Sequence, residues 1–376
     1  MELVFDIETD GLDATEIHCI VAIDENDNQY TFDIIDDNIL KGLDFLAEAD
    51  KLIGHNIIGF DIPVIKRLHD IDLWDKNKVI DTLVLSRLFN PVREKGHSLK
   101  VWGAKLGVSK DVAPEDFSVY TKDTLKYCIK DVILNKVLFD YLKKESAGFS
   151  KESINLEHYV TYILENQKEN GFKIDIQYAT TLLSELNCKI KQVQEEVHQT
   201  FKPKWIDVKE VKPKLKQDGT LSKSGLTDYE FENIQSSGNM KPFMRKELVE
   251  FNLGSRKQIG EYLISFGWKP NKFTPTGQPI VDEGTLKNIT HIREAKLIAD
   301  FLLYQKRIAQ ISSWLEAVED DDRVHGSVFS TGAITGRMAH RNPNMAQVPS
   351  VSSPYGKECR ACWVVDKGNK LVGIDA

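Results

Sequence analysis

Four carboxylates lie in sequence contexts that suit metal-dependent chemistry. Asp6 and Glu8 are two residues apart in "FDIET", and alternate residues of a β-strand project from one face. Asp61 lies in "HNIIGFDIP", where an apolar strand pattern gives way to a helical one. Asp131 follows Tyr127 by four residues in "YCIKD", so both share one face of a helix. Clustered carboxylates can hold two divalent cations that promote phosphodiester hydrolysis.

Each carboxylate also has a simpler interpretation, because a lone D-x-E pair on a strand is commonly a solvated face. The ordered set of three motifs within one domain favours the catalytic interpretation. Hard oxygen ligands suit Mg²⁺ or Mn²⁺, so we expect two ions of this kind at the site. The hydroxyl of Tyr127 would orient the attacking water.

The elements that must position these residues form an α/β pattern over residues 1–148. Residues 1–35 predict three strands, after which helical and strand patterns alternate. A polar stretch of small residues then marks a domain boundary. Helical periodicity dominates residues 149–322, whereas residues 323–376 predict strands and loops.

Residues 202–246 interrupt the helical region. They lack periodicity and are rich in Lys, Pro, Gly and Ser, which predicts a loop or a small insertion. Its lysines would give this stretch an electrostatic role in gripping a nucleic-acid backbone. These lysines are Lys202, Lys204, Lys209, Lys212, Lys214, Lys216 and Lys223.

The composition, with 41% hydrophobic and 28% charged residues, is ordinary for a globular protein. The net charge of −8 argues against a simple basic coat for nucleic acid, but not against an enzyme whose acids bind metal. No apolar run reaches the roughly 20 residues of a membrane span. The N-terminus has no basic segment, so we expect neither a signal peptide nor a membrane partner.

The five cysteines are scattered along the chain, which suggests reduced thiols and a cytoplasmic location. Cys359 and Cys362 form a C-x-x-C pair, but no second Cys or His pair accompanies them. We therefore interpret them as small buried residues on either side of Arg360 rather than as half of a zinc site.

The three carboxylate motifs resemble those of the DEDD exonuclease family, in its Tyr-containing subclass. The resemblance implies an RNase H-like fold with a mixed sheet and helices. It also implies that the four carboxylates bind metal and that the tyrosine positions the water. Thr9 and Leu12 of "ETDGL" would hold the 3′-terminal nucleotide, and Asn56 of "HN" would contact the substrate strand.

The string "TGRMAHRNPNMAQVP" resembles the signature of family A DNA polymerases. "IDTLVLSRL", "QKRI" and "HGSV" are similar to phrases of the replicative polymerases of short-tailed bacteriophages. The resemblance implies a thumb-type helical region at 149–322 and the start of a polymerase palm at 323–376. Arg337, Asn344 and Gln347 would contact primer-template DNA through groups that do not depend on base sequence.

The final residues, "KLVGIDA", resemble the start of the first catalytic motif of the palm, with Asp375 as an incomplete polymerase metal ligand. The family's fingers and later palm motifs do not follow. We therefore expect polymerisation to need the C-terminal half, as a separate or spliced chain from a split or interrupted gene. Host thioredoxin is a further candidate partner, because some phage polymerases bind it through an insertion in the thumb, where residues 202–246 of this chain would lie.

The resulting hypothesis is the N-terminal part of a phage-type family A DNA polymerase, acting in the cytoplasm of an infected bacterium. Its expected activity is metal-dependent 3′→5′ proofreading hydrolysis, with DNA as the partner. The alternatives are a stand-alone DEDD exonuclease and a non-catalytic DNA-clamping subunit.

Overall fold

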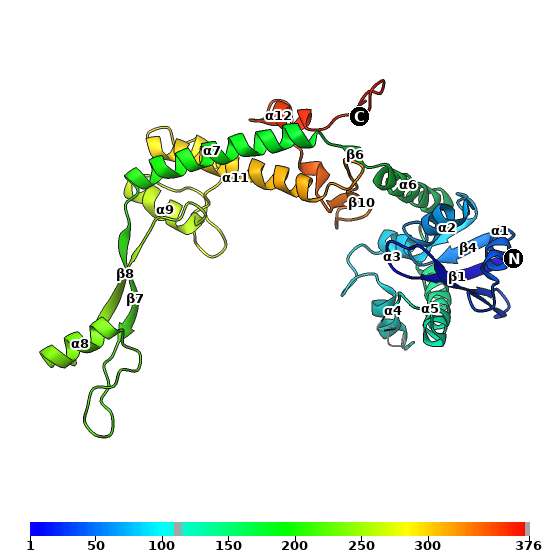
Figure 1. Cartoon of the computed structure of the whole chain (residues 1–376), viewed down its shortest axis with the longest axis horizontal. Helices are drawn as coiled ribbons and strands as arrows, with labels where there is room; N and C mark the ends of the chain where they lie inside the picture. The colour runs from blue at the N-terminus through cyan, green and yellow to red at the C-terminus, as the bar shows by residue number, and fades with distance from the viewer. Residues whose placement is uncertain (109–113, 115, 373–376) are drawn as a thin grey trace. The chain divides into compact units, whose positions relative to one another are not determined.

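The fold comes from a computed structural model that describes residues 1–108, 114 and 116–372 (Figure 1). The chain divides into two compact units, one formed by Met1–Asp175 with Glu316–Ala376 and the other by Ile176–Leu315. Within the described residues, none of the helices combines the length and apolar character needed to cross a bilayer.

The first unit is built on a five-stranded mixed sheet. Its strands are β1 (Glu2–Thr9), β2 (Ile17–Asp24), β3 (Gln29–Asp33), β4 (Lys51–Gly54) and β5 (Val79–Asp81). The order across the sheet is β3-β2-β1-β4-β5. Since β1 pairs antiparallel with β2 and parallel with β4, it is the central strand. The predicted α/β class and the three initial strands are confirmed.

Among the residues that the structure describes, five helices follow or lie between these strands before α6 (Lys151–Asn170). They are α1 (Ile39–Ala47), α2 (Asp61–His69), α3 (Thr82–Phe89), α4 (Leu99–Leu106) and α5 (Lys122–Glu145). Leu3 and Phe5 of β1 pack in a core that includes residues of α1 and α2. Val4 packs in a second core with residues of α4 and α5. Asp6 and Glu8 are two and four residues after Val4 on the strand, so they project from the same face as Val4, which is the face that α5 covers.

Local capping signals set the start of the helices near these residues. The side chain of Thr121 accepts a hydrogen bond from the backbone N–H of Thr124, and the Thr124 hydroxyl accepts one from the N–H of Thr121, each at 3.2 Å. This reciprocal pair begins α5. The helix α3 begins after Asp81, whose carboxylate accepts from the backbone N–H of Leu83 at 2.8 Å.

The remainder of the first unit consists of one long helix and several short elements. These are α6 (Lys151–Asn170), β6 (Phe172–Lys173), β9 (Arg323–Val324), β10 (Ser327–Phe329), β11 (Ala339–Arg341), the 3-10 helix η1 (Met345–Gln347) and α12 (Gly356–Ala361). Antiparallel pairs join β6 to β9 and β10 to β11. The short helix α12 was not predicted, because six residues show too little periodicity.

The second unit is mainly helical, as predicted. Its helices include α7 (Ile176–Thr200), α9 (Arg256–Ser265), α10 (Glu283–Lys287) and α11 (Arg293–Glu316). Aromatic rings form part of its core: Phe201 stacks on Phe251 with ring centroids 4.6 Å apart. Tyr262 packs edge-on against Phe201 at 4.9 Å.

The interruption at 202–246 is folded, which agrees with the predicted small insertion and not with the alternative of a loop. It contains β7 (Lys204–Val211) and β8 (Phe243–Val249), paired antiparallel, with α8 (Asp228–Ser237) between them in the chain. Seven of the eight β7 side chains are exposed. A ribbon without a buried face needs no alternation of apolar and polar residues, which is why periodicity did not reveal it.

Candidate active site

Asp6 and Glu8 project from β1 toward α5 and meet a thiol there. One carboxylate oxygen of each acid and the Sγ of Cys128 all lie within 4.8 Å of one another. The Cys128 thiol donates to the backbone carbonyl of Asp6 at 3.6 Å, and its Sγ lies 4.0 Å from Asp6 Oδ2. Both acids are half-buried. Donor atoms this close together can be ligands of a single cation.

Asp61, the first residue of α2, lies against the same strand. It is only 2% exposed, and its Oδ1 accepts a hydrogen bond from the backbone N–H of Ile7 at 3.2 Å. Burial raises the pKa of Asp61 to about 7, although the hydrogen bond from Ile7 opposes the shift. A buried carboxylate with this environment ionises more readily once a cation compensates its charge.

Tyr127 and Asp131 come from α5, in the stretch that also carries Cys128. Because Cys128 contacts Asp6, this stretch of the helix lies against β1. Asp131 is 5% exposed, and Tyr127 is half-buried with its ring edge-on to Phe117 at a centroid distance of 6.0 Å. The fold therefore places the start of α2 and this stretch of α5 beside the central strand that carries Asp6 and Glu8.

Thr9 and Leu12 lie at the end of β1 and just beyond it. The hydroxyl of Thr9 donates to the carbonyl of Gly11 at 2.8 Å, which shapes the turn after the strand. Leu12 is 88% exposed and lines a groove of about 460 Å³. Trp74 and Tyr162 also line this groove, stacked with ring centroids 4.1 Å apart. Sequence reasoning missed these two rings, because nothing in their local sequence indicates that they meet.

Asn56 is exposed on the loop between β4 and α2, and a residue that sequence reasoning missed holds this loop. Asp81 accepts hydrogen bonds from the backbone N–H groups of Asn56 at 2.9 Å and Ile58 at 3.1 Å. The N–H of Asp81 itself donates to Nε2 of His158 at 2.9 Å, while His158 Nδ1 donates to the carbonyl of Ile154 at 2.8 Å. The string "IDTLVL" contains a helix-capping Asp that would have identified Asp81.

Three further predicted contact residues lie in the C-terminal part of the first unit, and all three are exposed. Arg337 lies between β10 and β11. Asn344 caps η1, because its Oδ1 accepts from the backbone N–H of Ala346 at 3.2 Å, and Gln347 ends that helix. Asp375, the predicted polymerase metal ligand, lies outside the described residues.

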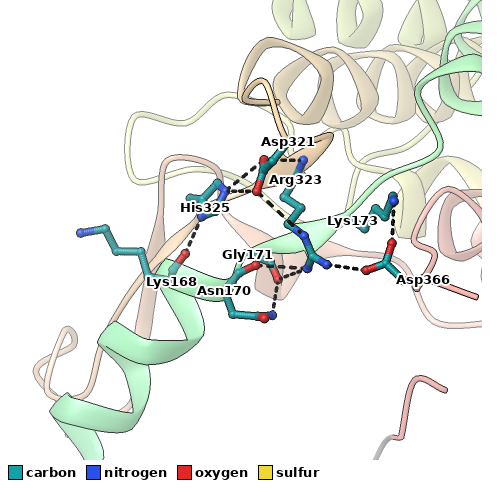
Figure 2. A network of polar contacts seen from close by, with 8 residues as sticks. All are labelled: Lys168, Asn170, Gly171, Lys173, Asp321, Arg323, His325 and Asp366. Atoms are coloured by element: carbon teal, nitrogen blue, oxygen red, sulfur yellow. Dashed lines mark hydrogen bonds and ion pairs between the residues drawn. The ribbon is translucent and has the colours of Figure 1, made fainter. Parts of the chain in front are cut away.

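A polar network joins the end of α6 to the strand β9 (Figure 2). The guanidinium of Arg323 donates to the carbonyl of Asn170 at 3.1 Å and to the carboxylate of Asp366 at 2.8 Å. Lys173 donates to the other oxygen of the same carboxylate at 2.6 Å. Asp366 is therefore shared by two cations from different segments.

His325 forms the other half of this network (Figure 2). Its Nδ1 donates to the carbonyl of Lys168 at 2.7 Å, and its Nε2 lies 3.3 Å from both carboxylate oxygens of Asp321. Burial lowers the pKa of His325, but the Lys168 carbonyl and the Asp321 carboxylate outweigh it, so the pKa is raised overall.

Two family models match separate parts of the chain. The 3′-5′ exonuclease model matches residues 2–147, and the DNA polymerase family A model matches residues 229–376. The DNA-directed DNA polymerases of Enterobacteria phage T3 and Escherichia phage T7 are each 28% identical to this chain. The alignments cover 96% of this chain and 64% of each phage protein. The chain thus spans just under two thirds of these relatives.

Bacterial relatives match a smaller part. DNA polymerase I of Helicobacter pylori strain J99 is 32% identical over 34% of this chain and 14% of its own length. The fold is similar to the POL domain of Pol1 from M. smegmatis, solved with DNA primer-template and dNTP, with a TM-score of 0.66 and 16% identity over 98% of this chain and 55% of that one. Residues 229–376 therefore match DNA polymerase family A, and residues 2–147 match the 3′-5′ exonuclease family.

Proposed function

We propose that this chain hydrolyses DNA from its 3′ end in a metal-dependent reaction, as the proofreading nuclease of a polymerase. The hydrogen bond from Ile7 to Asp61 carries this proposal. It ties a buried carboxyl group to the strand between Asp6 and Glu8, which brings a third metal-ligating group to that strand. The match to the 3′-5′ exonuclease family supports both the direction of hydrolysis and the need for a divalent metal.

The four predicted carboxylates, Asp6, Glu8, Asp61 and Asp131, would hold two ions of Mg²⁺ or Mn²⁺. Such ions, when bound, activate a water molecule and stabilise the leaving oxygen. The oxygen donors of this set fit these hard cations. The Tyr127 hydroxyl would accept or donate a hydrogen bond to orient the attacking water.

The groove beside Leu12 would receive the 3′-terminal nucleotide. Apolar and aromatic side chains hold bases without sequence preference, because every base has a flat face. The exposed side chain of Leu12 and the stacked rings of Trp74 and Tyr162 supply such surfaces. Thr9 would position the end of the strand, and Asn56 would contact its backbone.

Primer-template DNA would bind at Arg337, Asn344 and Gln347, whose exposed side chains offer neutral and cationic donors. DNA synthesis would also require the part of the phage relatives that does not align with this chain, supplied by the same protein or by a second chain. The polymerase match at residues 229–376 favours this assignment over a stand-alone nuclease or a clamping subunit. The phage relatives favour action in the cytoplasm of a host bacterium.

The test is degradation of a single-stranded oligonucleotide labelled at its 5′ end, with Mg²⁺ and with a chelator. Asp6→Asn and Glu8→Gln should each slow the reaction by about 10²-fold or more, as expected for loss of transition-state stabilisation. Glu2→Gln is the matched control, because Glu2 is an exposed acid on the same strand. Unchanged degradation by Asp6→Asn would falsify the assignment.

A second interaction is favoured by the ribbon of β7 and β8. Trp205 lies opposite Leu248, and Met244 lies on the same side of β8; these side chains are 67%, 53% and 49% exposed. The ion pair of Lys246 with Asp207, at 3.7 Å, lies between Leu248 and Met244 on this side of the ribbon. Exposed apolar side chains bordered by charges favour a protein interface, and thioredoxin is the candidate partner. Calorimetry with purified thioredoxin should show binding that Trp205→Ser removes and Ile264→Ser retains. Absence of binding to the unaltered chain contradicts this assignment.

A further inference from the structure

The carboxylate pair of β1 has a sulfur donor beside it that two-ion magnesium chemistry does not require. Cys128 Sγ lies 4.0 Å from Asp6 Oδ2 and within 4.8 Å of a Glu8 oxygen. A cation bound to all three side chains would have two hard oxygen ligands and one soft sulfur ligand. Sulfur ligands shift metal preference away from Mg²⁺ and toward cations such as Zn²⁺.

The thiol is fixed in this position by its surroundings. Cys128 is 0% exposed and belongs to the core between the sheet and α5. Its Sγ donates to the Asp6 carbonyl at 3.6 Å and interacts with the thiol of Cys19, which pairs with Glu8 in the strand register. The sulfur therefore does not need to move far to join the two carboxylates around a cation.

We propose that Asp6, Glu8 and Cys128 form a binding site for thiophilic divalent cations, Zn²⁺ or Cd²⁺, that overlaps the proposed magnesium site. On binding, the S–H bond of Cys128 breaks, a bond from sulfur to the cation forms, and the proton passes to solvent. Asp6 and Glu8 are then engaged by the soft cation, so nuclease activity stops. The inhibitory consequence rests on the proposed function, whereas the binding itself does not.

Cadmium is the probe, because a bond between Cd²⁺ and a thiolate absorbs in the ultraviolet through charge transfer. The full chain is titrated with Cd²⁺, and Mg²⁺ is then added as a competitor. We expect a Cd²⁺-thiolate absorption that Mg²⁺ reverses, because both cations use Asp6 and Glu8. In Cys128→Ser the affinity for Cd²⁺ should fall by at least about tenfold, the lower bound for loss of a group that tunes a metal site.

Two other sources of thiolate absorption are separated by design. Cys359 and Cys362 are not grouped with Asp6 and Glu8. Mg²⁺ bound to those carboxylates should therefore not reverse any absorption that Cys359 and Cys362 produce. Cys188→Ser is the matched control, because Cys188 is an exposed thiol, and this variant should retain the reversible absorption. Cadmium NMR of the unaltered chain gives a readout without any variant, since a site with one sulfur and several oxygens differs in chemical shift from a site with two sulfurs.

A Mg²⁺-reversible absorption that persists in a folded Cys128→Ser or Cys128→Ala variant overturns the proposal, as does a cadmium resonance without sulfur coordination. Loss of the reversible absorption in Asp6→Asn supports the shared site. If Asp6→Asn leaves Mg²⁺-dependent degradation unchanged while the unaltered chain binds Cd²⁺ through Cys128, the proposed nuclease site fails and the thiophilic site stands.

Discussion

The carboxylate of Asp81 accepts a hydrogen bond from the backbone N–H of Asn56 at 2.9 Å, which joins the start of α3 to the loop between β4 and α2. Asn56 has a φ of 69°, an uncommon conformation for a residue other than glycine. Its backbone therefore needs support from outside the loop. Because the same loop leads into Asp61, Asp81 helps to position a residue that we assign to the metal site.

Asp81→Asn should lower the free energy of unfolding by about 1–3 kcal/mol, because an amide nitrogen replaces one acceptor and a buried N–H loses its partner. Hydrogen exchange at Asn56 and Ile58 should accelerate, as measured by mass spectrometry. The control is Asp75→Asn, in an exposed turn where Asp75 accepts from the N–H of Asn77 at 2.6 Å. Equal stability losses for both variants would contradict a special role for Asp81.

Gly171→Ala should destabilise the first unit by about 1–3 kcal/mol, since a side chain there is strained and crowded. The φ of Gly171 is 60°, and an added Cβ would lie 2.7 Å from His325 Cε1 and 3.0 Å from Arg323 Cβ. Gly148→Ala is the matched control: its φ is 98°, but nothing lies within 4 Å of the added Cβ. Thermal unfolding should show the larger loss for Gly171→Ala, and the reverse order would rule out crowding as the cause.

His325→Gln should reduce stability more at acidic than at alkaline pH. The pKa of His325 is raised above its ordinary value of 6.5. A group with a raised folded-state pKa contributes stability that is fully present below 6.5 and is lost as pH rises through the folded-state value. The facing charges are Asp321 and Glu319, and Lys168 contributes through its backbone carbonyl. Asp321 must remain ionised, and its pKa is lowered, partly by its hydrogen bond to His325.

The measurement for His325 is urea unfolding of the unaltered chain and the variant at a series of pH values on both sides of 6.5. The difference in unfolding free energy should shrink toward alkaline pH. A difference that is independent of pH would show that the imidazole acts only by packing.

Arg337→Ala should weaken binding of primer-template DNA by about 1–3 kcal/mol, the range for loss of a well-placed arginine contact. The loss should be similar for different template sequences, because minor-groove acceptors are nearly the same for all base pairs. Fluorescence anisotropy with a labelled duplex measures it. Lys357→Ala, which removes an exposed cation from α12, should change affinity less. A loss confined to one template sequence would argue against the assigned contact.

The elements that carry the carboxylates were predictable. Strand alternation places Asp6 and Glu8 on one face of a strand, and helical periodicity places Tyr127 and Asp131 on one face of a helix. The contact of Cys128 with Asp6 was not predictable, since it spans 122 residues and depends on how α5 packs on the sheet. Likewise, the local sequence identifies Asp81 as a helix cap. It does not predict the hydrogen bonds of Asp81 with Asn56 and His158, which span 25 and 77 residues. Periodicity describes each helix or strand alone and does not predict which helices and strands contact one another.

The contacts of α6 also set the C-terminal boundary at which a shortened nuclease fragment could still fold. The buried N–H of Asp81 donates to His158, so removal of α6 would take away the protein partner of that donor. The same cut would take away Tyr162, one of the two stacked rings beside the groove. Although the family match ends at residue 147, a protease-resistant nuclease core should extend through Gly171.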